Sequence, residues 1–506
     1  MSNQDMARGP GSGSSASVLS GRLRIGLVVL ALGAVAILIL LRASGSSDPP
    51  EILPPVRPVL AVLPLIDLTG AGRDYFNGGL AAEIAAGLAT VPGLEVRARV
   101  SAGIYDDVNR DAAQAGAELG VSVVLDATVR RVSGQLRVAG RLIDTGSRAV
   151  VWSGVQDTTA VEWHGARDAI VAGVAGALGL EVDEQARRRL ERRQTGLEAF
   201  DLYALGRFGW AEGEGGDLLE AVSHYQLAIE ADSAFAPTWT ALAEAYAALP
   251  RFTRFPVERV RQEGAAAART ALRLDPDAAD AHAALGEILY LYERDLSGGR
   301  SHLTRAVELD PGNGASLARL CELEMYDGRL DEADVACRRG AEKEPLSFQL
   351  AWLEADLRKL QGDFGGALRS LDSLRILSPG YAPLAADAAF TALLAGDSTR
   401  VSDDLEYWLS LLGGDDALPA AWFGAGRSGA LRRLAAEVDP PPSDLAALAA
   451  LAGDDPMALA AARAALNGRD PGSLRFGVFP EFEALREQAA FQVLWEAALR
   501  ESEDIP

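Results

Sequence analysis

The 506-residue sequence contains very little lysine, and its charge is strongly unbalanced toward acid. Lysine occurs only at Lys343 and Lys359, so arginine supplies nearly all of the 48 basic residues, against 71 acidic ones. The formal net charge of −23 would repel a polyanion, because a nucleic-acid interface needs a basic stripe. We therefore expect no nucleic acid among the partners.

Histidine and cysteine are also too scarce for the usual catalytic and metal-binding motifs. The four histidines lie in no HExxH motif, and no serine lies in a GxSxG elbow. Cys321 and Cys337 form no CxxC pair and have no neighbouring histidine. They are either buried small apolar residues or partners in a disulfide formed in an oxidising compartment. We expect no catalytic residue, no metal, no cofactor and no enzyme activity.

A phosphate-binding loop is excluded by the same shortage of lysine. The stretch AVLPLIDLTGAGRDYFNGGL, residues 61–80, has a buried strand, a glycine-bearing loop and the start of a helix. A GxxxxGK[ST] loop needs a lysine after glycine, and neither lysine of this chain has one. Gly70 and Gly72 begin a GxGxxG spacing, but Tyr75 takes the third position. The loop is predicted to turn a corner.

The N-terminal region is predicted to carry a membrane anchor. Residues 1–24 are a Ser- and Gly-rich tail without apolar periodicity. The run IGLVVLALGAVAILILL, from Ile25 to Leu41, has 17 uncharged residues, which is near the lower limit for a membrane-spanning helix. A cleaved signal peptide is the alternative, but the run is longer than a usual signal-peptide core and Arg42 follows it directly. Residues 42–57 form a Pro- and Ser-rich linker.

Arginines are more frequent before this apolar run than after it. Arg8, Arg22 and Arg24 precede it, while only Arg42 and Arg57 follow closely. The positive-inside bias places the N-terminus in the cytoplasm. We therefore expect a single-pass protein of the cell inner membrane whose bulk is extracytoplasmic, which is the periplasm in a diderm bacterium.

A small α/β domain is predicted over residues 58–158. After the first strand and helix, LEVRAR reads as a second strand and RDAAQAGAELG as a second helix. In SVVLDATVRRVSGQLRVAGRLIDTGSRAVVWSGVQD apolar and polar residues alternate between two turns, which indicates three antiparallel strands. The order βαβαβββ predicts a mixed sheet with helices packed on it.

The blocks VLAVLPL, YFNGGL, LGVSVVLDATV and RLIDTGSRAVVWS, in this order, resemble the TolB-amino-terminal-like domain. Bacterial regulators and membrane proteins carry this domain ahead of tetratricopeptide repeats. The resemblance covers about a hundred residues, and it implies a domain type without a transferable catalytic motif.

The second half of the chain repeats with a period near 34 residues. After a connecting helix at 159–195, Gly328, Gly362 and Gly396 are spaced by 34, which is the length of a tetratricopeptide helix pair. We expect tetratricopeptide repeats over 196–412. The spacing decays over 413–506, where degenerate helical repeats and a C-terminal cap are predicted. The fold class is thus α/β plus all-α, with a transmembrane helix, a mixed-sheet domain and an α-solenoid.

The repeat register also singles out four acidic residues. Glu244, Glu287, Glu322 and Asp356 each follow a small residue on the first helix of a repeat. By resemblance to tetratricopeptide domains, that position faces the concave groove, where four carboxylates would favour a basic peptide. A solvated helix face in an acidic protein is the alternative. In either case we expect that changing all four to glutamine leaves folding almost unaffected.

Together these features predict a membrane-anchored scaffold that binds proteins or peptides through the α/β domain and the repeats. The alternative is a regulatory membrane protein that senses a ligand and relays it to a partner. A hydrolase that uses carboxylates alone is a third hypothesis, disfavoured because solenoids rarely enclose two carboxylates in a dry pocket.

Overall fold

The computed structural model describes residues 57–68, 74–97, 105, 109–132, 135–212, 215–253, 255–411, 435 and 440–503. All of these belong to one compact unit. The expected membrane span, Ile25–Leu41, and the loop glycines Gly70 and Gly72 lie outside the described residues. Within the described ranges, no helix combines the length and the apolar character needed to cross a bilayer.

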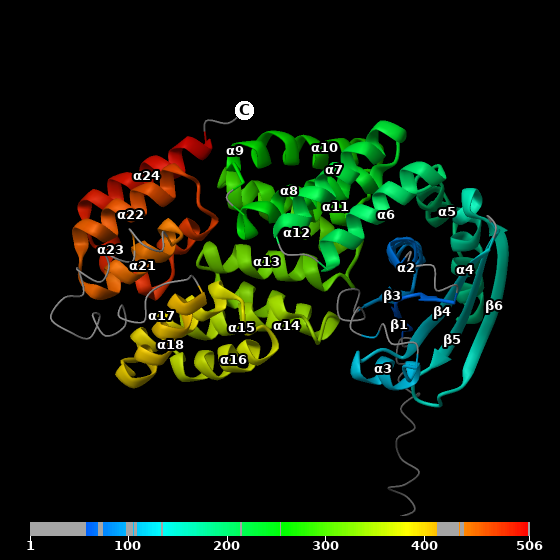
Figure 1. Ribbon diagram of the computed structural model, residues 1–506, viewed down its shortest axis with the longest axis horizontal. Coiled ribbons are helices and arrows are strands. Elements are labelled where there is room, and N and C mark those ends of the chain that lie inside the picture. Colours follow the sequence, from blue (N-terminus) through cyan, green and yellow to red (C-terminus); the bar gives the residue numbers. More distant parts are fainter. Residues whose placement is uncertain are drawn as a thin grey trace, which may run out of the picture. The chain divides into compact units, whose positions relative to one another are not determined.

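A mixed β-sheet lies at the N-terminal side of this unit (Figure 1). Its strands are β1 (Val59–Val62), β2 (Ile66–Asp67), β3 (Glu95–Val96), β4 (Val123–Val132), β5 (Gln135–Asp144) and β6 (Val150–Thr159). The strand order is β3-β1-β4-β5-β6, and β2 pairs with β4. β1 is parallel to β3 and β4, while β4, β5 and β6 are antiparallel. The predicted mixed sheet with three successive antiparallel strands is therefore confirmed.

Helices cover both faces of the sheet. Since neighbouring strand residues point to opposite faces, they pack against different helices. Leu60 and Leu125 belong to the core that includes residues of α2 (Asp74–Ala89) and α4 (Trp163–Ala177). Ala61 and Val124 pack instead in a smaller core with α3 (Ala112–Glu118). Sequence alternation thus decides which helix each strand residue meets.

The segment 159–195, expected as one connecting helix, is divided into shorter pieces. These are η2 (Ala160–Glu162), α4 and α5 (Glu184–Glu191). Gly179 takes a φ of +70°, which is left-handed backbone that ends α4, and the side chain of Asp183 caps α5. The interruption returns α5 toward α2, which it contacts.

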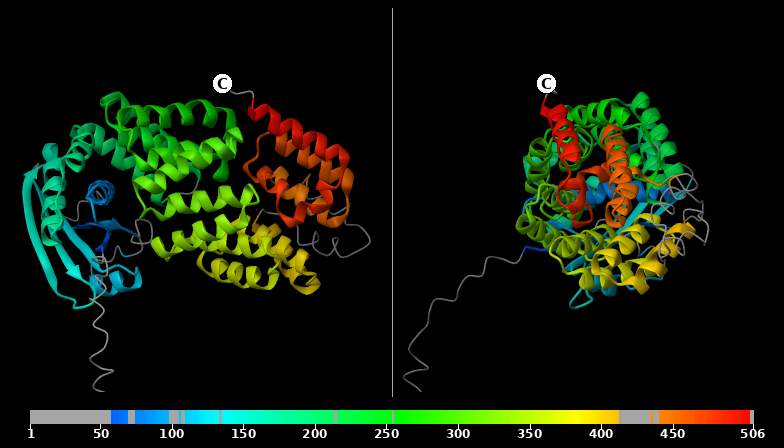
Figure 2. Two further views of the ribbon diagram at one scale, coloured as in Figure 1. Left: turned by 180° about the vertical axis from the view of Figure 1, so that it is seen from behind. Right: turned by 90° about the vertical axis from the view of Figure 1, so that its left-hand side faces the viewer.

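Paired antiparallel helices follow, and consecutive pairs lie side by side (Figures 1 and 2). Their bounds are α6 (Leu197–Glu212), α7 (Gly215–Ala231), α8 (Ala236–Phe252), α9 (Val257–Arg259), η3 (Val260–Gly264), α10 (Ala265–Leu274), α11 (Ala279–Ile288), η4 (Leu289–Glu293), α12 (Leu296–Leu309), α13 (Gly314–Tyr326), α14 (Leu330–Lys343), α15 (Phe348–Leu360), α16 (Phe364–Leu377), α17 (Ala382–Ala395) and α18 (Ser398–Leu411). This is a tetratricopeptide-like solenoid, as the repeat period predicts.

The glycines that are spaced by 34 residues turn the chain between the two helices of a pair. Gly328, Gly362 and Gly396 have φ values of +72°, +80° and +71°, and each lies between the two helices of a pair. Left-handed backbone at this point is easily reached only by glycine, so the residue ends the first helix and turns the chain into the second.

The C-terminal region consists of α21 (Pro442–Ala452), α22 (Asp455–Asn467), η5 (Pro471–Gly477), η6 (Pro480–Phe482), α23 (Glu483–Arg486) and α24 (Ala489–Glu503). Its apolar side chains form one core with those of α16, α17 and α18. The segment η5–η6 contacts α13, η4 and α17, so this region packs back onto the middle of the solenoid.

Candidate functional site

The four carboxylates predicted from the repeat register lie on successive first helices of the solenoid. Glu244 is on α8, Glu287 on α11, Glu322 on α13 and Asp356 on α15. We call these four residues the carboxylate row. Its members are half-buried or buried, and cations of the same chain contact three of them. A partner would therefore meet a row that is already partly neutralised.

Arg251 joins the two central members of the row. Its Nη2 atom lies 3.1 Å from Glu287 and 3.0 Å from Glu322, and Arg319 donates a second hydrogen bond to Glu287 at 2.5 Å. Burial opposes the ionisation of Glu287, but Arg319 and Arg251 together hold the pKa of its carboxyl below the usual range. The hydroxyl of Tyr290 donates to Glu322 at 2.7 Å. The centre of the row is thus a closed, hydrogen-bonded network.

The C-terminal end of the row contacts the C-terminal region. Lys359 is buried and forms ion pairs with Asp356 at 2.9 Å and with Asp387 of α17. Arg475 of η5 reaches the same Asp387 at 3.2 Å. Burial, and then the charge of Asp387, raise the pKa of Asp356 to about 7. Phe479 closes this end, since both Lys359 and Arg475 lie over its ring.

Glu244, at the N-terminal end, has a different environment. Burial and the nearby Asp280 raise the pKa of its carboxyl to about 7. It lines a cavity of about 330 Å³ together with residues of the sheet domain, including Val62 and Val96. Arg207 of α6 lines the same cavity. Glu244 is thus the member of the row that faces a cavity.

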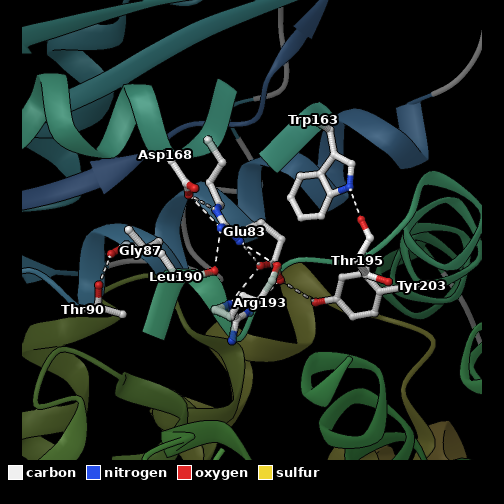
Figure 3. A network of polar contacts seen from close by, with 10 residues as sticks. Glu83, Gly87, Thr90, Trp163, Asp168, Leu190, Arg193, Thr195 and Tyr203 are labelled. Atoms are coloured by element: carbon white, nitrogen blue, oxygen red, sulfur yellow. Dashed lines mark hydrogen bonds and ion pairs between the residues drawn. The ribbon is translucent and has the colours of Figure 1, made fainter. Parts of the chain in front are cut away.

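A buried ionic network connects the sheet domain to the solenoid beside this cavity (Figure 3). Glu83 of α2 is fully buried and accepts hydrogen bonds from Arg193 at 2.6 and 2.9 Å. Arg167 of α4, also fully buried, lies 3.6 Å from Glu83 and donates to the carbonyl of Leu190 at 2.8 Å. Tyr203 of α6 donates to Glu83 at 3.3 Å. One carboxylate therefore joins α2, α4 and α6.

Close helix packing accompanies this network. A Cβ atom on Gly79 of α2 would lie 2.7 Å from the Cβ atom of Ala204 on α6, which is closer than real side chains approach. The glycine thus allows α2 to pack against the first repeat.

The two cysteines are joined in a disulfide between the helices of one repeat. Cys321 of α13 and Cys337 of α14 are both buried, with their Cα atoms 5.2 Å apart. Of the two alternatives that the sequence allowed, the bonded pair is the one found.

The cations that pair with the carboxylate row were not predicted from the sequence. Lys359 carried a local signal, because it follows Asp356 by three residues and pairs with it. Arg319 precedes Glu322 by three residues, but it pairs with Glu287 of another helix. Arg251 had no such signal, since it contacts a carboxylate 71 residues away.

No family model matches the chain. A stretch of 164 residues is 30% identical to a Rhizobium meliloti (strain 1021) protein named putative adenylate cyclase 3. The match covers 32% of this chain and 28% of that protein, so the chain spans less than a third of the length of this relative.

Solved structures with similar helix pairs include several tetratricopeptide proteins. A Parabacteroides merdae tetratricopeptide repeat protein has a TM-score of 0.32 and 14% identity over 61% of this chain and 100% of that one. YrrB, described as a tetratricopeptide protein with an unusual peptide-binding site, has a TM-score of 0.27 and 16% identity over 37% and 91%. Human IFIT1, in a complex with m7Gppp-AAAA, has a TM-score of 0.39 and 15% identity over 60% and 81%. The chain's own helix pairs and glycine turns define its class as a tetratricopeptide-like solenoid with a small mixed sheet.

In the described part of the chain, no group of three or more His, Cys, Asp or Glu residues has a geometry that could hold a metal ion.

Proposed function

We propose that this chain is a membrane-anchored scaffold that binds a protein or peptide partner along the carboxylate row. The observation that carries the proposal is the alignment of Glu244, Glu287, Glu322 and Asp356 on successive helices of one solenoid. Stacked helix pairs offer an extended surface, and such surfaces are the usual binding sites of repeat proteins. A basic segment of the partner would be attracted by the row.

At the centre of the row, a basic peptide would have to displace arginines that already pair with the carboxylates. Arg251 and Arg319 already satisfy the central carboxylates, so a basic peptide would gain little there unless it replaced one of them. Glu244 has no such resident cation within hydrogen-bonding distance among the described residues. We therefore place the first contact of a basic partner at the Glu244 end.

The test is co-purification of the full-length chain from solubilised membranes, followed by mass spectrometry. The proposal expects a stable partner protein whose recovery falls as salt is raised, because screening weakens exposed charge pairs over a Debye length of about 8 Å at physiological ionic strength. The Glu244→Gln variant should recover less of it, whereas Glu308→Gln, a change at an exposed carboxylate, should not. Absence of any stoichiometric partner would reject the scaffold.

Membrane anchoring through Ile25–Leu41, with the bulk of the chain outside the cytoplasm, is part of the proposal. The disulfide between Cys321 and Cys337 supports this location, since disulfides persist in oxidising compartments and are rare in the cytosol. Protease added to spheroplasts should digest the folded region while a cytoplasmic marker survives. Protection of both would reverse the orientation.

The proposal does not include nucleotide cyclisation. The segment shared with the Rhizobium protein covers 28% of that protein, and we interpret it as a module that the two chains have in common.

A further inference from the structure

The cavity of about 330 Å³ has walls from both parts of the folded region. On one side lie β1, β3 and α2 of the sheet domain, and on the other lie α6, α8 and the start of α11. Much of its surface is apolar. The apolar lining includes Val62, Ala82, Ala85, Val96, Phe208 and Ala241. This volume is at the lower end of the range for small-molecule sites, which are typically about 300 to 1,000 Å³.

Two opposite charges line this cavity without a hydrogen-bonded partner among the described residues. Arg97 is bonded to Glu95, Arg193 to Glu83, and Asp280 accepts a hydrogen bond from Asn313. Arg207 and Glu244 form no hydrogen bond or ion pair with any residue that the structure describes. Arg207 comes from α6 and Glu244 from α8, so neighbouring helices bring to the cavity a guanidinium and a carboxyl whose hydrogen-bonding groups are available to a ligand.

We propose that this cavity binds a small zwitterion with an apolar side chain, as a free amino acid or a short peptide. The carboxylate of the ligand pairs with Arg207, whose planar guanidinium accommodates a carboxylate with two parallel hydrogen bonds. The ammonium pairs with Glu244, where Asp280 adds negative potential. The side chain of the ligand packs on the apolar wall.

The remaining charges favour a zwitterion over an ion of one sign. A simple anion attracted by Arg207 would also face the carboxyls of Glu244 and Asp280. A simple cation attracted by Glu244 would face Arg207 and Arg193. Only a ligand with both charges satisfies both unpaired groups, and each charge-assisted hydrogen bond is stronger than a neutral one.

The cavity shares Glu244 with the carboxylate row, but its ligand also needs Arg207, which is not a member of the row. Arg207→Met therefore tests the cavity apart from the scaffold function. Because its walls come from both the sheet domain and the first repeats, a bound ligand would hold the two together. It should therefore raise the melting temperature of the folded chain, since any ligand that binds only the folded state stabilises it.

The experiment is thermal shift and calorimetric titration of the full-length chain in detergent with matched ligands. Leucine and leucyl-leucine carry both charges and an apolar side chain, and their comparison distinguishes a free amino acid from a peptide. N-acetyl-leucine lacks the ammonium, leucinamide lacks the carboxylate, and aspartate lacks the apolar side chain. At least one of the first two should raise the melting temperature, and the last three should bind at least about tenfold more weakly.

Two substitutions locate the site. Arg207→Met and Glu244→Gln should each weaken binding of the active zwitterion about tenfold or more, because each removes a charge-assisted hydrogen bond. Arg188→Met and Glu308→Gln change exposed charges outside the cavity and should bind like the parent. Arg207 forms no hydrogen bond or ion pair with the described residues, so its substitution remains informative if Glu244→Gln alters folding. The proposal is overturned if neither zwitterion shifts melting, or if Arg207→Met binds like the parent.

Discussion

Glu83 and Arg193 are 110 residues apart in the sequence, yet they form two hydrogen bonds, and this pair lies where the sheet domain meets the solenoid. Arg167 completes the arrangement, since its guanidinium and the Glu83 carboxylate are both fully buried. Arg193 thus depends on Glu83, whereas Arg167 also pairs with Asp168 at 2.7 Å. A buried pair of this kind adds little net stability when intact, but removing one partner leaves an uncompensated charge.

Glu83→Gln should therefore be strongly destabilising, by about 3 to 5 kcal/mol in the free energy of unfolding. The loss arises because Arg193 stays charged with no other ion pair among the described residues, although Arg167 keeps its pair with Asp168. Chemical denaturation of the variant and the parent would measure it. The matched control is Asp157→Asn, which breaks the exposed pair between Arg137 and Asp157 and should leave the denaturation midpoint unchanged. Equal midpoints for Glu83→Gln and the parent would mean that water reaches the network.

The raised pKa of Glu244 predicts how stability depends on pH. Its pKa of about 7 in the folded chain lies above the ordinary value, so the folded state binds more protons than the unfolded state between about pH 4 and pH 7. The contribution of this group to stability is fully present below the unfolded pKa and is lost as pH rises through 7. Asp356 contributes with the same sign.

We expect Glu244→Gln to remove part of this dependence. At pH 8 the variant should be more stable than the parent by on the order of 1 kcal/mol, because the parent must hold a poorly solvated carboxylate. At pH 5 the two should unfold alike. Urea titrations at pH 5, 6, 7 and 8 would show the difference. Glu308→Gln, at an exposed site, should follow the parent at every pH. A variant that loses stability at pH 8 would show that the charged form of Glu244 has a stabilising partner.

The disulfide predicts sensitivity to reduction. Cys321 and Cys337 are 16 residues apart, and closing a loop of about this length restricts the unfolded chain by about 3 kcal/mol in the loop-entropy model. Reductant, or replacement of both cysteines by serine, should lower the melting temperature. Replacement by alanine separates this effect from the cost of burying two hydroxyls, since both sites are buried. If reductant leaves melting unchanged while the thiols become reactive, the disulfide does not contribute to stability.

The sequence predicted the structural features that depend on local residue spacing. Gly328, Gly362 and Gly396 indicated the helix pairs because each needs left-handed backbone at the same point of the repeat. Alternation along β4–β6 indicated the antiparallel strands for a similar reason. Pairs such as Arg251 and Glu322 could not be predicted, because they depend on the rotation between successive repeats, and no short sequence pattern encodes this rotation.

Because such long-range pairs cannot be predicted from the sequence, the sequence and the structure lead to different expectations for how substitutions in the carboxylate row affect folding. From sequence, replacing all four carboxylates by glutamine should leave folding almost unaffected. In the structure Glu322 is buried and accepts hydrogen bonds from Arg251 at 3.0 Å, Tyr290 at 2.7 Å and Tyr326 at 3.2 Å. A glutamine has one acceptor oxygen where the carboxylate has two, so it cannot satisfy all three donors.

Glu322→Gln alone should therefore destabilise the chain by about 1 to 3 kcal/mol, which is the usual effect of leaving buried polar groups unsatisfied. The double variant with Arg251→Met should lose less than the sum of the two single variants, because the charge that Glu322 neutralises is then absent. Denaturation of the parent, both single variants and the double variant forms the complete cycle. Strict additivity, or a Glu322→Gln variant as stable as the parent, would show that Glu322 and Arg251 act independently and that this part of the row behaves as a solvated helix face.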